Sequence, residues 1–315
     1  MELPTKVIVV VGMGRSGSTL LSRLLGITPG VLDAGVMQYF WEKRAAQERN
    51  FCGCGERVAN CPFWSEVLAR AFGDSPPDLR TQARLERRSE KDRNLPLALL
   101  RPLRTADADR AQAASLEAME RLIPAAVEVA GARVFVDSSK VLSRAILLRR
   151  SPRFTVSVIH LVRDSRGTVA AWARGSTSAA SPAKRPIRRI DPHTTAFRWL
   201  KRHLLAEICR PALGPVLRVR YEDLATDPVG TIDRVLSFAG IAARPVGLEA
   251  DGFDASPSHQ VGGNPMKAAS GLIAIRLDEQ WKSELSTRTR LGVTCATFPL
   301  LLRYRYPLWP RRPAG

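Results

Sequence analysis

A glycine-containing segment near the start of the chain limits the fold more than any other feature. Residues 7–26 read VIVVVGMGRSGSTLLSRLLG. The run of branched aliphatic residues predicts a buried parallel strand, Gly12 and Gly17 bracket a turn, and leucines at helical spacing predict a helix that begins at Ser18. A strand that passes through a glycine turn into a helix directs backbone N–H groups and the positive end of the helix dipole toward one point. We therefore predict an anion-binding loop.

The residues of this loop distinguish it from a Walker A motif. The spacing of Gly12 and Gly17 fits the start of that motif, but Ser18 stands where its lysine is required. Arg15 supplies the nearest positive charge, and a guanidinium donates two N–H groups to a tetrahedral oxyanion such as phosphate or sulfate. A turn that only reverses the chain is the alternative. The combination of strand, glycines, hydroxyls and arginine favours anion binding.

The rest of the chain alternates between apolar and helical patterns. Strands are predicted at residues 6–11, 133–136, 155–162 and 216–220. Helices are predicted at residues 18–26, 110–130, 140–149, 165–174, 194–209 and 229–240. Strands separated by helices indicate an α/β fold, in which a parallel sheet is flanked by helices on both faces.

Composition restricts the class of protein and its partners. The chain has 315 residues, of which 45% are hydrophobic and 25% charged, as expected for one globular domain. Its net charge of +18 indicates either a polyanionic ligand or an arginine-rich composition spread over solvated helices. Aromatic residues are few and do not alternate with basic ones, so no nucleic-acid partner is predicted. With no apolar run near 18 residues and no signal peptide, we predict no integral membrane segment and a cytoplasmic location. Oligomeric state stays open.

Four motifs resemble those of PAPS-dependent sulfotransferases of the bacterial type, in the family's order. Arg15–Leu21 (RSGSTLL) is similar to the family's 5′-phosphosulfate loop, with Gly14 where a proline is usual. Residues 134–172 contain DSSK and then LVRDSRG and a tryptophan, residues 219–224 read VRYEDL, and residues 259–267 read HQVGGNPMK. The resemblance covers residues 7–282.

This resemblance implies a single sulfotransferase domain over residues 1–315 with a P-loop NTPase-like fold. We expect a nucleotide-binding core, variable insertions on the acceptor side and a C-terminal tail, which are residues 5–30 with 131–282, residues 31–130 with 174–192, and residues 283–315. Residues 174–190 carry five basic residues and no acidic one. They predict a loop that is either a lid over substrate or a surface insertion.

The resemblance also implies the residues that hold PAPS (3′-phosphoadenosine 5′-phosphosulfate), the co-substrate. They are Arg15, Ser16, Gly17, Ser18 and Thr19 at the 5′-phosphosulfate, Arg163 at the 3′-phosphate, Tyr221 near the adenine, and Gly263, Asn264 and Lys267 in a closing loop. Two positions depart from the family pattern. Ala171 stands where a serine usually binds the 3′-phosphate, and Lys267 replaces a common arginine.

The implied reaction moves a sulfuryl group from PAPS to a hydroxyl or amine of a small molecule, sugar or lipid. Arg15 and Lys140 are the predicted catalytic residues. The family's glutamate base corresponds to Val36, which cannot accept a proton, so Asp33, Glu42 and His193 are the substitute candidates. Otherwise the acceptor ionises unaided, or the chain is a PAPS-binding or PAP-binding regulatory protein that has lost catalysis. An ATP-dependent kinase is disfavoured by Ser18.

Three cysteines form a cluster at residues 52, 54 and 61. Zinc usually takes four ligands, and no histidine is nearby in the sequence. A cytoplasmic enzyme seldom keeps disulfides. We therefore predict a loop that packs on Phe63 and Trp64, and no metal.

Overall fold

The computed structural model describes residues 3–46, 50–90, 92, 95, 106–175, 189–262 and 264–309. Most of the loop predicted at residues 174–190 lies outside these ranges, as does Gly263. Within them, no helix is long and apolar enough to cross a membrane.

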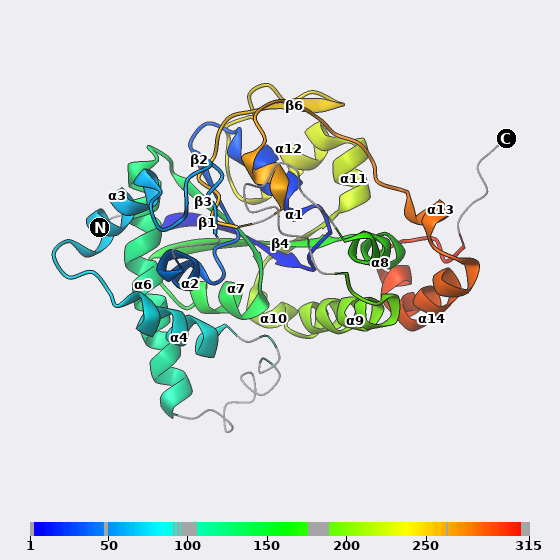
Figure 1. Cartoon of the computed structure of the whole chain (residues 1–315), viewed down its shortest axis with the longest axis horizontal. Helices are drawn as coiled ribbons and strands as arrows, with labels where there is room; N and C mark the ends of the chain where they lie inside the picture. Colours follow the sequence, from blue (N-terminus) through cyan, green and yellow to red (C-terminus); the bar gives the residue numbers. More distant parts are fainter. Residues whose placement is uncertain are drawn as a thin grey trace.

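A parallel sheet with β1 at its centre organises the chain (Figure 1). Its described strands are β1 (Thr5–Gly12), β2 (Val31–Gly35), β3 (Val134–Lys140), β4 (Phe154–Val162) and β5 (Val216–Arg220), in the order β2-β3-β1-β4-β5. Strand β1 pairs in parallel with β3 and with β4, so that Val9 lies opposite Asp137 on one side and Val158 on the other. The predicted α/β class with a parallel sheet is confirmed.

Alternate residues of β1 enter two hydrophobic cores. Val7, Val9 and Val11 pack in a core with helices α6 and α7, whereas Ile8 and Val10 pack in a second core with α1 and α12. In Figure 1, α7 lies below the sheet and α1 and α12 above it, while α6 runs past the sheet at the left. An unbroken aliphatic strand is stable here because both of its faces are buried.

The helices have the following bounds: α1 (Ser18–Gly26), α2 (Phe40–Ala45), α3 (Pro62–Phe72), α4 (Leu79–Ser89), α6 (Ala106–Val129), α7 (Leu142–Leu148), α8 (Ser165–Arg174), α9 (Pro192–Ile208), α10 (Arg210–Leu213), α11 (Tyr221–Thr226), α12 (Pro228–Phe238), the 3₁₀ helix η3 (Pro265–Ala268), α13 (Trp281–Glu284) and α14 (Thr287–Arg303). A hairpin of β6 (Gly252–Ala255) and β7 (Gly271–Ala274) lies beyond α12. Helix α9 packs on α8 and α14.

The predicted strands and helices are all present, with bounds shifted by a few residues. Strand β2 was not predicted, because its five residues include Asp33 and Gly35, which are depleted in strands. It forms because β3 provides a partner, with Val31 opposite Val134. The division into a nucleotide core and acceptor-side insertions stays a prediction.

Candidate nucleotide site

The loop between β1 and α1 has the backbone that its glycines predict. Gly12 and Gly17 have φ of 143° and 84°, and Arg15 also has a positive φ of 68°. A Cβ on Gly17 would lie 2.6 Å from the ring of Tyr221, so glycine is required there by space as well as by φ. No side chain caps α1, which begins at Ser18. The start of this helix is therefore available to a ligand.

A cavity of about 370 Å³ lies beside this loop, at the carboxyl ends of β1, β4 and β5. We call it the arginine cavity, because its charged lining residues are Arg15, Arg163, Arg174, Arg276 and Asp278. Its size is within the range of roughly 300–1,000 Å³ that ligand pockets occupy. Four guanidinium groups against one carboxylate make it a site for an anion.

Part of the Arg15 guanidinium group is buried without a partner in the part of the protein that the structure describes. Its Nη2 atom is buried without a hydrogen-bond partner among the described residues, and the neighbouring Ser16 Oγ is in the same condition. Burial, and then the positive charges of Arg174 and Arg163, lower the pKa of Arg15. Its guanidinium lies 5.8 Å from the ring centroid of Trp172. A buried donor without an acceptor is costly, so this group is arranged for an acceptor from outside the chain.

Arg163 lies at the end of β4 but is already held by the protein. Nη1 donates to the Arg15 carbonyl at 3.1 Å, and Nη2 donates to the carbonyl of Asp278 and forms an ion pair with its carboxylate, both at 2.9 Å. The guanidinium stacks over Tyr221 at 4.3 Å. The neighbouring Asp164 does not pair with Arg163 but with Arg166, and it caps α8. Arg163 therefore faces the cavity while it also anchors the loop.

Tyr221 and Asn264 complete the walls that the sequence predicted. The Tyr221 hydroxyl accepts from Asp278 N at 3.1 Å and donates to the Arg276 carbonyl at 3.3 Å. Asn264 Oδ1 accepts from Met266 N, and Asn264 N donates to Thr19 Oγ1 at 3.5 Å. The closing segment is thus attached to the start of α1.

Three further positions named by the sequence motifs lie at or next to the cavity. Ser18 and Thr19 are buried in the first turn of α1, next to the lining residues Gly17 and Leu20. Ala171, at the position of the family's serine, lines the cavity.

Lys267 is turned away from the arginine cavity. Its Nζ donates to the Phe51 carbonyl, and burial lowers its pKa. The sequence pattern placed this side chain at a phosphate, but the fold directs it to the loop after α2.

Lys140 lies at the carboxyl edge of the sheet, opposite Val11 of β1, but does not line the cavity. Its φ is 68° and its Nζ donates to the Ser138 carbonyl at 2.6 Å. Burial lowers the pKa of Lys140 to about 8.

None of the three candidate bases lines the arginine cavity. Asp33 is buried within β2, accepts from Gly35 N at 3.0 Å and from the Gln260 amide, and burial raises its pKa to about 6. Glu42 forms an ion pair with Arg87 at 2.6 Å. His193 is exposed in the first turn of α9.

Sequence reasoning missed Lys43 of α2, which lies beside the vacant base position. Its Nζ donates to the carbonyls of Val36 at 2.8 Å and Gln38 at 2.6 Å. Burial lowers the pKa of Lys43 to about 7, against an attraction to Glu86 that raises it. No local signal marks this lysine, because only the fold of the 36–43 segment brings it back onto Val36.

A buried cluster of charges lies behind Lys43. Arg144 of α7 forms ion pairs with Asp137, Glu86 and Glu90, and all four side chains are buried. Burial raises the pKa of Glu86 to about 7 and that of Glu90 to about 8, although Arg144 opposes both shifts. We call this set the Arg144 cluster.

The cysteine prediction rested on a missing fourth ligand, and the fold supplies one. Cys52, Cys54, Cys61 and His259 bring their sulfur and nitrogen atoms within 4.8 Å of one another. The cysteines do pack near Phe63 and Trp64, as predicted. No histidine is close to them in the sequence, but His259 is close to them in the folded chain.

Comparison with known proteins identifies the class. Residues 7–245 match the family described as "Sulfotransferase family", so the chain belongs to the sulfotransferases. It resembles the sulfotransferase domain of the Synechococcus PCC 7002 olefin synthase, at 18% identity over 98% of this chain and 97% of that one, with a TM-score of 0.51. It also resembles the sulfotransferase domain from the curacin biosynthetic pathway, at 17% identity over 98% and 100%, with a TM-score of 0.53. These likenesses show the sulfotransferase fold. No curated protein matches the chain.

Proposed function

We propose that this sulfotransferase uses PAPS and transfers its sulfuryl group to a hydroxyl or amine of a small molecule, sugar or lipid. The observation that carries the proposal is the unpartnered, buried Nη2 of Arg15 in a cavity with four arginines. Arg15 lies in a loop that has no Walker lysine. The loop therefore suits a phosphosulfate better than a magnesium-bound triphosphate.

The cavity residues divide into two groups for such a nucleotide. Arg15, Gly17 and the first turn of α1 would hold the 5′-phosphosulfate through a guanidinium and helix N–H groups. Arg163 would hold the 3′-phosphate, with the ring of Tyr221 beside it. Arg174 and Arg276 add positive charge to the cavity, and the sequence motifs did not predict either of them as a binding residue.

The reaction requires one bond to form and one to break. The acceptor oxygen or nitrogen bonds to sulfur, the bond between sulfur and the 5′-phosphate oxygen breaks, and its electron pair stays on the phosphate. Arg15 is suited to stabilise the charge that develops there. Lys140 remains the second predicted catalytic residue, at the edge of the sheet and outside the cavity lining. The acceptor's proton must leave to a base.

Lys43 is our candidate for that base, alongside the predicted Asp33, Glu42 and His193. It contacts Val36, where the family's glutamate would stand, and a pKa of about 7 leaves much of it neutral at physiological pH. Its contacts with Val36 and Gln38 use two N–H groups, so the neutral amine retains a lone pair for a proton.

A turnover assay tests the proposal. The purified chain is incubated with PAPS and a panel of phenols, sugars, amines and lipid alcohols, and release of adenosine 3′,5′-bisphosphate is measured. We expect acceptor-dependent release that Arg15→Ala abolishes and that does not need magnesium. Binding of PAPS without release for any acceptor would instead indicate a regulatory protein. Magnesium-dependent ADP release from ATP would indicate a kinase.

A further inference from the structure

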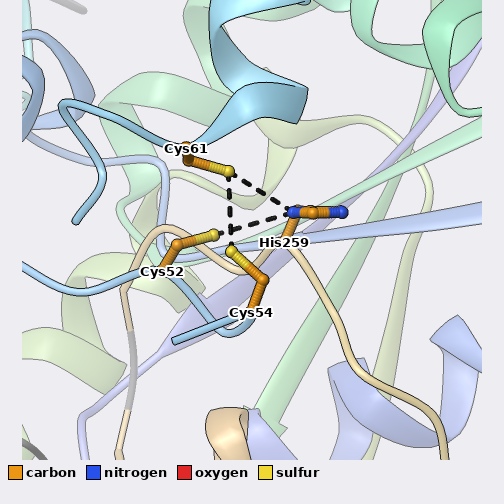
Figure 2. A group of neighbouring side chains, drawn as sticks. All are labelled: Cys52, Cys54, Cys61 and His259. Atoms are coloured by element: carbon orange, nitrogen blue, oxygen red, sulfur yellow. Dashed lines mark hydrogen bonds between the residues drawn. The ribbon is translucent and has the colours of Figure 1, made fainter. Parts of the chain in front are cut away.

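Three cysteines and one histidine from distant parts of the sequence converge outside the arginine cavity (Figure 2). The loop before α3 carries the cysteines, and the segment before η3 carries His259. Figure 2 shows one ring nitrogen of His259, Nδ1, directed at the sulfurs and the other directed away. Cys52 and Cys61 are buried.

Three of the six distances between these atoms are close to those of ligands around one tetrahedral ion, and all six are within 4.8 Å. With zinc–sulfur bonds near 2.3 Å and zinc–nitrogen bonds near 2.0–2.1 Å, tetrahedral edges are about 3.8 Å between two sulfurs and about 3.6 Å between sulfur and nitrogen. Cys54 and Cys61 have their sulfurs 3.7 Å apart, and Nδ1 of His259 lies 3.4 Å from the Cys61 sulfur and 4.0 Å from that of Cys52. A disulfide would need about 2.05 Å.

Surrounding contacts hold the histidine in this orientation. The ring of Phe63 stacks on the His259 ring with centroids 4.6 Å apart and planes 11° apart, and Trp64 Nε1 donates to the His259 carbonyl at 2.8 Å. Phe63 and Trp64 thus fix the ligand as well as packing the loop. Such support is usual for the ligands of a metal.

The two segments also meet through their backbones. Gly53 N donates to the Gln260 carbonyl at 3.0 Å, and a Cβ on Gly53 would lie 2.5 Å from Ser258 Oγ. The Lys267 ammonium, which donates to the Phe51 carbonyl, lies near Cys52 and Cys54 and would offset the negative charge that these residues carry as metal-bound thiolates.

We propose that Cys52, Cys54, Cys61 and His259 bind one Zn²⁺ in a closed structural site. Three thiolates and an imidazole in a tetrahedron form a donor set that zinc prefers. With four protein ligands there is no open position for a substrate, so the role is structural. Binding releases the thiol protons and involves no redox change.

The site would connect the acceptor-side insertion to a wall of the arginine cavity. His259 precedes Asn264 and Met266, which line that cavity. A zinc ion would therefore fix the position of this wall relative to the 50–61 loop. This second part of the inference rests on the proposed function, whereas the metal site itself does not.

Metal analysis of the purified full-length chain tests the site. We expect one zinc per chain, and tetrahedral cobalt–thiolate absorption bands after exchange with Co²⁺. Cys61→Ser and His259→Ala should lose the metal, whereas Cys295→Ser, which changes an exposed cysteine of α14, should keep it. A wild-type chain that contains no zinc and binds neither added Zn²⁺ nor Co²⁺ would overturn the proposal.

Two further measurements separate the possible outcomes. If a ligand variant does not fold, removal of zinc from the wild-type chain with a chelator replaces it, and readdition of Zn²⁺ should restore the melting temperature. We expect metal-free protein to bind adenosine 3′,5′-bisphosphate about tenfold more weakly. A shift of the segment that carries Asn264 would remove about one hydrogen bond to the nucleotide, and this is the expected size of that loss. If the affinity for this nucleotide is unchanged, the zinc site does not fix the wall of the arginine cavity, although the metal site itself stands. A chain that binds zinc but never this nucleotide would refute the proposed function instead.

Discussion

The arginine cavity and the Arg144 cluster are two charged regions that differ in how their charges are balanced. In the cavity, four arginines face one carboxylate and a guanidinium nitrogen of Arg15 has no partner. In the cluster, Arg144 is enclosed by three carboxyl groups, and all of these side chains are buried. The cavity is suited to an anion from outside. The cluster instead pairs its one cation with carboxyl groups of the protein, although one oxygen each of Glu86 and Glu90 has no hydrogen-bond partner among the described residues.

The difference teaches what each region contributes. An uncompensated positive charge at the surface of a cavity is stabilised when an anionic ligand binds, so it contributes to binding. A buried charge with partners is costly to disturb and serves to hold the fold. Lys43 is partly buried near the cluster and contacts the Val36 carbonyl, but it does not line the cavity.

The largest expected effect is on the rate of transfer and concerns Lys43. Lys43→Arg keeps a positive donor but cannot lose its proton, so kcat should fall by about 10²–10⁴ while nucleotide affinity is retained. In the wild type, kcat/KM should rise with pH through about 7, as the amine becomes neutral. Stopped assays across this pH range measure both effects.

Parallel variants of Asp33, Glu42 and His193 are the comparison for Lys43. Asp33→Asn, Glu42→Gln and His193→Ala should keep the pH profile. If one of them loses turnover while Lys43→Arg does not, that residue is the base, and Lys43 only positions the segment. Val36→Glu should change turnover rather than nucleotide affinity, provided the variant folds.

The next effect is on stability and concerns Arg144. Arg144→Ala leaves buried carboxyl groups without their cation and should lower the free energy of unfolding by about 3–5 kcal/mol. Arg87→Ala, which removes the exposed partner of Glu42, should lower the free energy of unfolding far less, because water screens that ion pair. Urea denaturation compares the two. If both variants lose the same free energy of unfolding, Arg144 does not stabilise the buried carboxyl groups as described.

A smaller effect on binding is expected from the cavity arginines. Arg15→Ala and Arg163→Ala should each weaken adenosine 3′,5′-bisphosphate binding by about 1.5–3 kcal/mol, roughly tenfold to over a hundredfold. Only Arg163→Ala should also lower the melting temperature, because Arg163 holds the Arg15 and Asp278 carbonyls. Calorimetry with wild-type affinity in both variants would contradict the assignment of the cavity.

The last effect is a change in how stability depends on pH. The folded pKa of Glu90 is raised to about 8 by burial, so the folded chain binds more protons than the unfolded chain between about pH 4.5 and 8. Its contribution to stability is present at low pH and is lost as the pH rises through this range. Glu90→Gln should remove that loss. Parallel stability profiles for the variant and the wild type, measured at pH 5 and pH 8, would refute this interpretation.

Prediction from the sequence succeeded where the pattern was local. The β1–loop–α1 unit was predicted with its bounds nearly correct, because both cores require aliphatic residues on β1 and the helix stripe is periodic. Helix α8 was likewise predicted with its observed bounds, residues 165–174. The prediction failed for β2, which owes its strand to pairing with β3.

By itself the sequence determined the class of fold, the glycine-containing turn between β1 and α1 and the arginine at the end of β4, because each depends on neighbours within one strand–turn–helix unit. Only the tertiary structure decided that Arg174, Arg276 and Asp278 share the cavity, that Lys267 turns away from it, and that His259 meets three cysteines. The physical reason is distance along the chain. His259 and Cys61 are 198 residues apart and Arg163 and Asp278 are 115 apart, so their contacts depend on how the packed layers bring distant segments together.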